Sequence, residues 1–559
     1  MQKALDSKVD KYINEVFKCQ NDIFYFITTY CRDYTLPNYP RITKIHKKQE
    51  YIINTFLNDH YVIVMGSRQT GKTMAAIWIL SWLTLFYPNY KSGVLSRKAE
   101  SSFAIITEVK NNLMNLRKPF AVDLRPGNTK IGDASKSIDS YLQLKNNSDI
   151  RAITVQKDKP EEAGRGFRFG TIFVDEVAFI TDIEKVMSGI ENTTNRIFIS
   201  YEKLNYPYGI ILASTPNGTV KTGKYFYQQW TMAEASLSKY KSCRFHWSEV
   251  PEYTQEWFAA KTKGLSPRTI AQEYDLVFLG SNESFFSDDT IKQLQDESLD
   301  KEAKAVHLFS NYNLSVFKEF ESDRVYLIGI DSATLYGADL SAIEVIDFET
   351  CEQIAEFIGK CSVTDLITIL ERIVRLYPTS LLIPESNSLG NQIIEYLANH
   401  PTLKKQLFKQ EIKDVNRGTV TYKYGLQTTA ESRPVMIEEL YTQVSSDVTK
   451  LYSRALKLQL VGLENKNGKI EGQPDDAVMA LAFTYFVRKR FPHAVSSVRP
   501  TKSSNIDFLT LYKQRYNVDD DKKEMNILGN LGIGQTQNIQ SDRLFKTFET
   551  LFLHGESKE

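Results

Sequence analysis

The sequence predicts an α/β protein with two successive domains, and three observations lead to this prediction. The stretch "YVIVMGSRQTGKT" (61–73) is an apolar strand, a Gly-rich turn and the start of an apolar helix. Two later apolar runs, "TIFV" and "YGIILA", end abruptly in polar residues, as strands that deliver side chains to a site do. Further along, a predicted hairpin, a strand and an apolar helix each carry a carboxylate.

Length and composition are those of an ordinary globular protein. The 559 residues are enough for two or three domains, and 42% are hydrophobic and 25% charged. The net charge of +1 excludes a globally basic nucleic-acid binder, so any DNA contact must be local. We expect an ATPase-type domain at 1–280, a hinge at 281–322, a second domain at 323–490 and a flexible tail at 491–559.

Cysteine usage and hydropathy indicate a soluble cytoplasmic protein without a membrane partner. The N-terminus "MQKALDSKVDKY" lacks the apolar core of a signal peptide. The longest apolar run, 74–87, is too short to cross a bilayer. No pair of cysteines has metal-ligand spacing, which favours reduced thiols; the five are Cys19, Cys31, Cys243, Cys351 and Cys361.

The Gly-rich turn matches the spacing of a phosphate-binding loop (P-loop). Backbone N–H groups and the following helix dipole attract an anion in such a turn. Lys72 is expected to reach the β- and γ-phosphates of ATP, and the Thr73 hydroxyl to hold Mg²⁺. The predicted nucleotide-binding turn comprises Gly66, Ser67, Arg68, Gln69, Thr70, Gly71, Lys72 and Thr73. Upstream, Gln49 either reads the adenine edge or is an exposed helical glutamine; both interpretations stand.

Hydrolytic groups are expected at the ends of the two later strands. Asp175 can join the Mg²⁺ shell, and Glu176 can orient and deprotonate the attacking water. The strand that ends at Ser214 and Thr215 can sense the γ-phosphate and pass hydrolysis to a moving part. Arg68 is favoured as a residue that stabilises charge during hydrolysis, and Arg165 and Arg168 are left open as arginine fingers, in cis or across a subunit interface.

Acidic residues characterise the second predicted domain. Asp331 ends an apolar strand, Glu385 follows another, and Asp475 and Asp476 begin an apolar helix. Singly, each has a plain reading as a turn, surface or helix-capping residue. Together they predict a site for two Mg²⁺ or Mn²⁺ ions that clamp a phosphodiester. Residues 404–423 hold six basic against two acidic residues and could contact DNA, although a solvated charged face fits almost as well; Arg433 could contact phosphate nearby.

With both halves in view, the chain resembles the large terminase subunit of tailed bacteriophages over roughly residues 20–490. The resemblance rests on "SRQTGKT", "IFVDE", "STPNG", "GIDSA", "IPESN" and "DDAVMALA" in this order. It implies an additional-strand P-loop ATPase domain followed by an RNase H/resolvase-like nuclease domain. It also implies that Ser214 and Thr215 form the coupling motif and that Asp331, Glu385 and Asp476 bind the nuclease metals, with Asp475 as the alternative.

The resemblance further implies a viral DNA-packaging motor in the host cell cytoplasm. Such a motor hydrolyses ATP to drive double-stranded DNA into an empty capsid and cuts concatemeric DNA with a metal-dependent endonuclease. Its expected partners are the portal protein, the small terminase subunit and further copies of itself, arranged as a ring on the portal and expected to be a pentamer.

Two other functions fit parts of the sequence. A cellular helicase or repair motor with a fused nuclease would use the same P-loop, but it would carry further nucleotide-contacting motifs after "STPNG". A nucleotide-gated DNA scaffold would need an inert acidic cluster. Strand displacement and metal-dependent nicking separate these functions from a packaging motor.

Overall fold

The computed structural model of the chain describes residues 2–33, 36–122, 134–156, 158–164, 166–280, 284–333, 340–386, 389–414, 419–466, 469–472 and 474–499. The chain forms two compact units. The first contains Met1–Asp300 and Tyr441–Val478, and the second contains Lys301–Leu440 and Met479–Glu559. These limits differ from the predicted ones because the first unit takes in a segment from late in the sequence.

The first unit is built on an eight-stranded sheet with the strand order β3-β4-β5-β2-β6-β7-β1-β8. The six neighbouring strands β5-β2-β6-β7-β1-β8 run parallel, so their carboxyl ends lie along one edge of the sheet. Antiparallel β3 and β4 complete the other side, and β4 and β5 form a hairpin around 145–148. The strands are β1 Tyr61–Gly66, β2 Lys91–Leu95, β3 Ala134–Ile138, β4 Tyr141–Leu144, β5 Asp149–Ala152, β6 Thr171–Asp175, β7 Gly209–Ser214 and β8 Lys241–Phe245.

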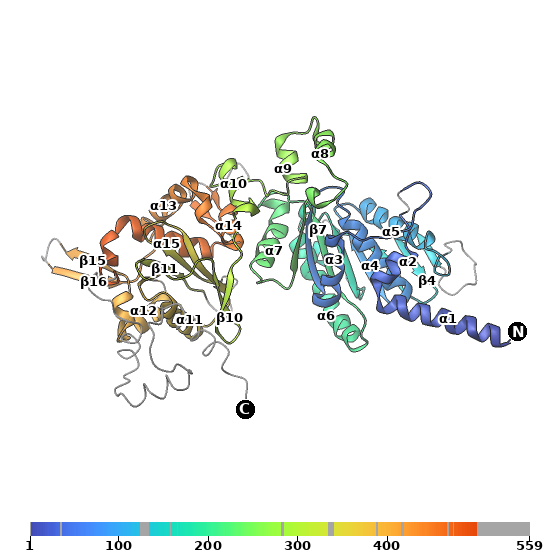
Figure 1. Cartoon of the computed structure of the whole chain (residues 1–559), viewed down its shortest axis with the longest axis horizontal. Coiled ribbons are helices and arrows are strands. Elements are labelled where there is room, and N and C mark those ends of the chain that lie inside the picture. The colour runs from blue at the N-terminus through green and yellow to red at the C-terminus, as the bar shows by residue number, and fades with distance from the viewer. Residues whose placement is uncertain are drawn as a thin grey trace, which may run out of the picture. The chain divides into compact units, whose positions relative to one another are not determined.

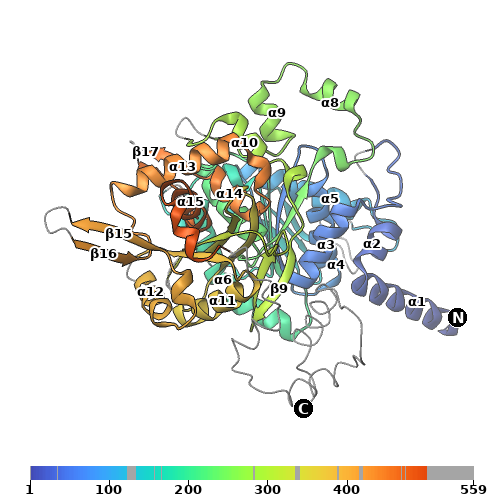
Figure 2. The same ribbon diagram turned by 60° about the vertical axis from the view of Figure 1, so that its left-hand side comes forward.

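Helices cover this sheet, and α4 is its central buried helix. The α4 sequence is apolar on all sides, and nearly every one of its side chains is buried. α1 extends away from the rest of the unit and exposes Tyr12, Ile13 and Phe17 (Figures 1 and 2). The α-helices of the first unit are α1 Gln2–Asn21, α2 Ile23–Tyr30, α3 Lys47–Asp59, α4 Lys72–Phe86, α5 Ala99–Met114, α6 Ile183–Lys203, α7 Lys224–Glu234, α8 Gln255–Thr262, α9 Pro267–Glu273, α10 Asp288–Leu294 and α14 Arg454–Val461.

The second unit contains a six-stranded sheet with the order β14-β11-β12-β13-β10-β9. β11 and β12 form the predicted antiparallel hairpin, and β14 runs parallel to β11. The strands are β9 Lys304–Phe309, β10 Tyr312–Val316, β11 Tyr326–Asp331, β12 Ser341–Asp347, β13 Gln353–Gly359 and β14 Ser380–Pro384. β9 and β10 lie in the stretch 281–322 expected to be a hinge. β9 is the edge strand and β10 beside it is only partly buried, so both tolerate polar residues.

Helices cover both faces of the second sheet. α11 (Val363–Leu376) and α12 (Gly390–Asn399) pack on the face that carries Ile328 and Ile330. α15 (Asp476–Arg490) lies against the other face, where a Cβ on Gly329 would come within 1.9 Å of the Ala480 carbonyl oxygen. Only glycine therefore fits at position 329 of the central strand. Figure 1 shows β11 between these helices.

Three smaller elements complete the chain. α13 (Ser432–Ser446) contains Arg433, and the hairpins are β15 (Lys409–Asp414) with β16 (Thr419–Tyr424) and β17 (Glu464–Lys466) with β18 (Lys469–Glu471). The predicted C-terminal tail lies outside the described residues beyond Arg499. Among the described residues, no helix combines the length and hydrophobicity needed to cross a bilayer.

Candidate functional site

The Gly-rich turn stands where the sequence predicts it, between β1 and α4. Gly71 is the N-cap of α4 and has φ +87°, a left-handed conformation that favours glycine. A Cβ at this position would also lie 2.6 Å from the Gln49 amide nitrogen. The turn is therefore shaped by α3 as well as by its own sequence.

Gln49 supports the turn from α3. Its side-chain Nε2 donates to the Gly71 carbonyl oxygen at 3.1 Å, and its Oε1 accepts from the His46 backbone N–H at 3.2 Å. The side chain is 9% exposed, so it is not the exposed helical glutamine that we left open. Reading of adenine by Gln49 stays a prediction.

Lys72 and Asp175 lie in the same buried region at the carboxyl edge of the first sheet. Lys72 is 8% exposed and donates from Nζ to the Gly66 carbonyl oxygen at 3.3 Å. Burial raises the pKa of Asp175 to about 6, and the nearby Lys72 ammonium opposes that rise. The Asp175 Oδ1 atom is buried and has no hydrogen-bond partner within the described part of the chain. Such an oxygen fits the coordination sphere of a magnesium–nucleotide complex.

Glu176 follows Asp175 in an unusual backbone conformation, with φ +52°. The short 3₁₀ helix Val177–Phe179 comes next, and two side chains from the β7 tip hold it. Ser214 Oγ accepts from the Ala178 N–H at 3.2 Å, and Asn217 Nδ2 donates to the Ala178 carbonyl oxygen at 3.0 Å. The expected coupling residue Ser214 thus contacts the segment that carries the expected catalytic carboxylate.

Thr215 also lies at this edge. It is fully buried, and its Oγ1 has no hydrogen-bond partner among the described residues. Because β7 lies beside both β1 and β6, Thr215 follows a strand flanked by the P-loop strand and the Asp175 strand. The carboxyl edge therefore holds two buried oxygen atoms whose hydrogen-bonding capacity is unused, on Asp175 and Thr215.

Arg68 forms an ion pair with Glu273. Its Nε lies 2.7 Å from Glu273 Oε2, and this hydrogen bond raises the pKa of the guanidinium. The arginine side chain is 62% exposed, so the pair contributes at most about 1 kcal/mol. In this structure Arg68 is bound to a carboxylate of its own chain at the place where the sequence predicts contact with phosphate.

Arg168 lies near the opposite edge of the sheet. Gly170, two residues later, donates to the Lys91 carbonyl oxygen at the amino end of β2. Asp175 is at the carboxyl end of β6, about 13 Å away from the strand's start at roughly 3.3 Å per residue. Arg165 lies outside the described residues.

Asp331 and Glu385 are brought together in the second unit. Ile330 of β11 pairs with Pro384 of parallel β14, and the Glu385 N–H donates to the Ile330 carbonyl oxygen at 3.2 Å. The two carboxylates therefore follow adjacent strand ends at one edge. Strand alternation places Asp331 on the same face as Gly329, against which α15 packs.

Asp476 is the first residue of α15 and is 9% exposed, and Asp475 precedes it. Within the described ranges, no three or more His, Cys, Asp or Glu side chains form a group that could hold a metal ion. The expected carboxylates supply oxygen atoms suited to a hard divalent ion. Adjacent strands thus bring two of these carboxylates, Asp331 and Glu385, to the same edge of the sheet. The three-ligand metal centre stays a prediction.

Solved structures of phage large terminases are similar to this chain. The large terminase of thermophilic bacteriophage D6E in complex with ADP matches 80% of this chain and 99% of its own, with 11% identity and a TM-score of 0.32. The large terminase ATPase domain of Thermus phage P74-26 matches 42% of this chain and 94% of its own, with 19% identity and a TM-score of 0.31. The magnesium-bound large terminase nuclease of thermophilic phage G20c matches 37% and 98%, with 14% identity and a TM-score of 0.26.

No protein-family model matches the sequence. The similar structures are terminases, the family that the sequence motifs resemble. Their identities and TM-scores are too low to carry a functional conclusion. The function therefore has to follow from the residues described above.

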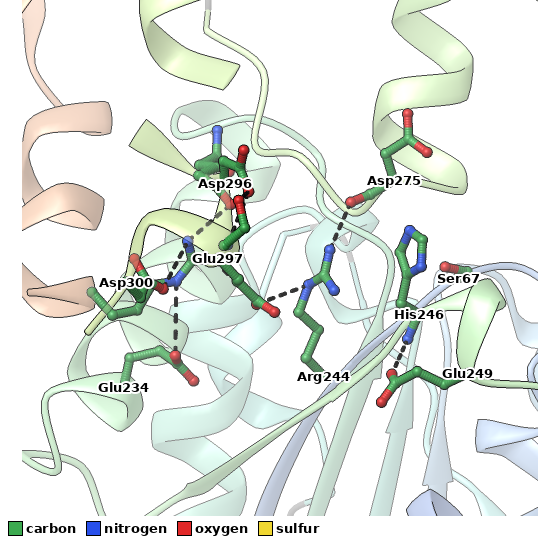
Figure 3. Close-up of polar contacts among 12 residues, drawn as sticks. Ser67, Glu234, Arg244, His246, Glu249, Asp275, Asp296, Glu297 and Asp300 are labelled. Atoms are coloured by element: carbon green, nitrogen blue, oxygen red, sulfur yellow. Dashed lines mark hydrogen bonds and ion pairs between the residues drawn. The ribbon is translucent and has the colours of Figure 1, made fainter. Parts of the chain in front are cut away.

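β8 pairs with β1, the strand that leads into the P-loop. A network of ion pairs holds β8 in place. Arg244 of β8 donates to the Asp275 carbonyl oxygen at 3.0 Å and pairs with Glu297 at 3.1 Å (Figure 3). Arg454 of α14 lies 3.6 Å from the same Glu297 carboxylate, and Lys457 pairs with Asp300. The late segment 441–478 is thus tied to the strand that borders the P-loop strand.

Sequence reasoning missed the residues that hold the P-loop from outside. They include Tyr253, Glu273 and Tyr274, and β8 was not predicted as a strand. Asn217, which holds the turn at Ala178 and not the P-loop, was also missed and could have been noticed within "STPNG". The others act through contacts about 180–210 residues distant, and no local spacing marks them.

Proposed function

We propose that the chain is the large subunit of a viral DNA-packaging motor. It hydrolyses ATP to move double-stranded DNA into an empty capsid, and it cuts the concatemeric DNA as a metal-dependent endonuclease. One observation carries the proposal: P-loop, Asp-Glu and Ser-Thr segments meet at one sheet edge, while a separate sheet carries paired strand-end carboxylates. The order of the sequence motifs supports the same conclusion.

ATP would bind with its phosphates on the P-loop backbone and α4 N-terminus. Thr73 and Asp175 would hold Mg²⁺, which neutralises charge on the phosphates. The unpartnered Asp175 oxygen supports this role. Lys72 would move from the Gly66 carbonyl oxygen to the phosphates.

Glu176 would accept a proton from the attacking water. Arg68 would stabilise charge on the γ-phosphate, for which it has to leave Glu273. Ser214 would report hydrolysis, because its hydroxyl contacts the turn after Glu176. The position of the β7 tip would then depend on whether ATP is bound.

DNA cutting would use Asp331, Glu385 and Asp476, with Asp475 as the alternative ligand. Ala480 of α15, one helical turn after Asp476, packs on Gly329, two residues before Asp331. These carboxylates would hold two Mg²⁺ or Mn²⁺ ions, which activate the phosphodiester and stabilise the leaving oxygen. The adjacent strands β11 and β14 would hold Asp331 and Glu385 in fixed positions for the metal ions.

The partners follow from this function. Double-stranded DNA, the portal protein, the small terminase subunit and other copies of the chain in a portal-bound ring would surround it in the host cytoplasm. The basic stretch 404–423 includes exposed Lys404 and Lys405, and the side chains of 411–421 lie outside the described residues. It remains the candidate DNA contact.

Separate loss of the two activities tests the proposal. Asp331→Ala should abolish Mn²⁺-dependent plasmid nicking and leave ATP hydrolysis within about twofold, because the carboxylates act on DNA only. Lys72→Ala should abolish ATP hydrolysis and keep nicking. Glu395→Gln, on the exposed side of α12, is the control for both assays. Nicking that persists in Asp331→Ala would contradict the assignment of the second unit.

A further inference from the structure

One segment, residues 245–274, contacts three consecutive residues of the P-loop. The Ser67 N–H donates to the Phe245 carbonyl oxygen at 3.0 Å, and the Ser67 hydroxyl donates to that of Tyr274 at 2.6 Å. The Arg68 N–H donates to the Glu273 carbonyl oxygen at 3.1 Å. The third of these residues, Gln69, is contacted by a side chain, the Tyr253 hydroxyl.

Tyr253 donates from its hydroxyl to the Gln69 carbonyl oxygen at 2.7 Å. Gln69 has φ +64°, a conformation that a residue with a Cβ adopts only when its surroundings hold it. Burial raises the pKa of the Tyr253 phenol, so the hydroxyl keeps its proton. The hydrogen bond is therefore in place at any physiological pH.

The Tyr253 ring is itself held in position. It stacks on Trp257 with centroids 3.8 Å apart and planes 6° from parallel. Trp257 lies 6.2 Å from Trp247, which stacks on Phe258 at 4.3 Å. Thr254 accepts from the Trp257 N–H as the N-cap of α8, which fixes the backbone beside Tyr253. The hydroxyl therefore approaches the P-loop from a rigid aromatic base.

The geometry points to Tyr253 as a positioning residue of the nucleotide site, an inference that rests on the proposed function. A peptide unit is planar, so the Gln69 carbonyl and the Thr70 N–H point in opposite directions. Tyr253 holds the carbonyl and thereby directs the Thr70 N–H. That N–H donates to the Ser67 carbonyl oxygen with a nitrogen–oxygen distance of 3.5 Å, at the weak limit of hydrogen bonding. We propose that Tyr253 in this way aims a P-loop donor at the phosphates of ATP.

Tyr253→Phe tests the inference because it removes the hydroxyl and keeps the stacked ring. The Kd and KM for MgATP should rise about three- to tenfold, the value of one net hydrogen bond. The kcat should change by less than about twofold, because the N–H binds phosphate in the ground state and the transition state alike. A residue with only a structural role would lower the unfolding temperature without this split between KM and kcat.

Tyr87→Phe is the matched control. The Tyr87 hydroxyl also donates to a backbone carbonyl oxygen, that of Gln20 at 3.1 Å, away from the P-loop. Unchanged Kd and KM in Tyr253→Phe, or an equal rise in Tyr87→Phe, would overturn the inference while wild-type turnover upholds the ATPase. A wild-type protein that neither binds nor hydrolyses ATP would instead overturn the proposed function.

Discussion

At the scale of single residues, the conformation of Glu176 is the most informative feature of the first unit. Its φ of +52° is costly for a residue with a Cβ and persists only where neighbours enforce it. Ser214 and Asn217 supply such neighbours through Ala178. The carboxylate is therefore presented by a turn that is held by one side chain at the end of β7 and one from the loop after it.

Glu176→Gln should bind ATP with an affinity within about twofold of wild type and hydrolyse it about 10²- to 10⁴-fold more slowly, because an amide cannot accept the proton of the attacking water. Nucleotide binding and phosphate release on the same preparation measure both quantities. Glu202→Gln, at an exposed position of α6, is the control. Turnover at the wild-type rate would exclude Glu176 as the base.

The sequence predicts where these residues lie in the fold, because they are local in the chain; their roles stay predictions. Eight consecutive residues form the P-loop, and Asp175 and Glu176 follow a strand directly. Glu273 and Tyr253 could not be predicted, because they reach the P-loop across about two hundred residues. Their partners include backbone atoms, which leave no signature in residue type.

At the scale of elements, the residue pattern of each strand explains why some strands were predicted from the sequence and others were not. β6, β7 and β11 were predictable because long apolar runs end at polar residues. β8 was not, because "KSCRF" has a mixed pattern and is only partly buried. β9, within the segment 281–322, was not predicted for a similar reason, since an edge strand carries polar residues on its open side.

A buried acidic pair crosses two strands of the second sheet. Glu344 of β12 faces Glu356 of β13 in register, and both are almost entirely buried. Gln353 donates to Glu344 at 2.9 Å. Burial first, and the Glu356 charge second, raise the pKa of Glu344 well above its ordinary value.

This pair predicts a pH-dependent stability. A group whose pKa is raised by folding stabilises the fold while it is protonated, and that contribution is lost as the pH rises through the folded pKa. Glu344→Gln keeps the hydrogen-bonding shape without the charge. It should raise the unfolding temperature of the second unit by about 3 °C at about pH 8 and have little effect at about pH 4.

Thermal unfolding of the full chain across this pH range measures the effect, with exposed Glu395→Gln as the control. An equal shift at both ends of the range would show that the charge of Glu344 is not responsible. A lower unfolding temperature at high pH would contradict the sign of the effect.

At the scale of the whole molecule, the two units carry different chemistry on different sheets. On the proposed function, the first offers an edge for the nucleotide, and the second carries Asp331 and Glu385 at adjacent strand ends. Arg168 adds a constraint, because it lies in the loop before β6, near the amino edge of the sheet, whereas Asp175 ends β6 at the carboxyl edge. An arginine finger at Arg168 would therefore serve the nucleotide of a neighbouring subunit, which agrees with a ring of copies.

DNA packaging is the measurement that tests the central claim most directly. Purified protein, ATP, double-stranded DNA and empty capsids that carry their portal are combined, and the DNA protected from added nuclease is measured. Wild-type protein should give ATP-dependent protection, and Lys72→Ala and Glu176→Gln should give none. No protected DNA, together with robust ATP-driven unwinding of a forked duplex by the same preparation, would contradict the packaging function and favour a helicase.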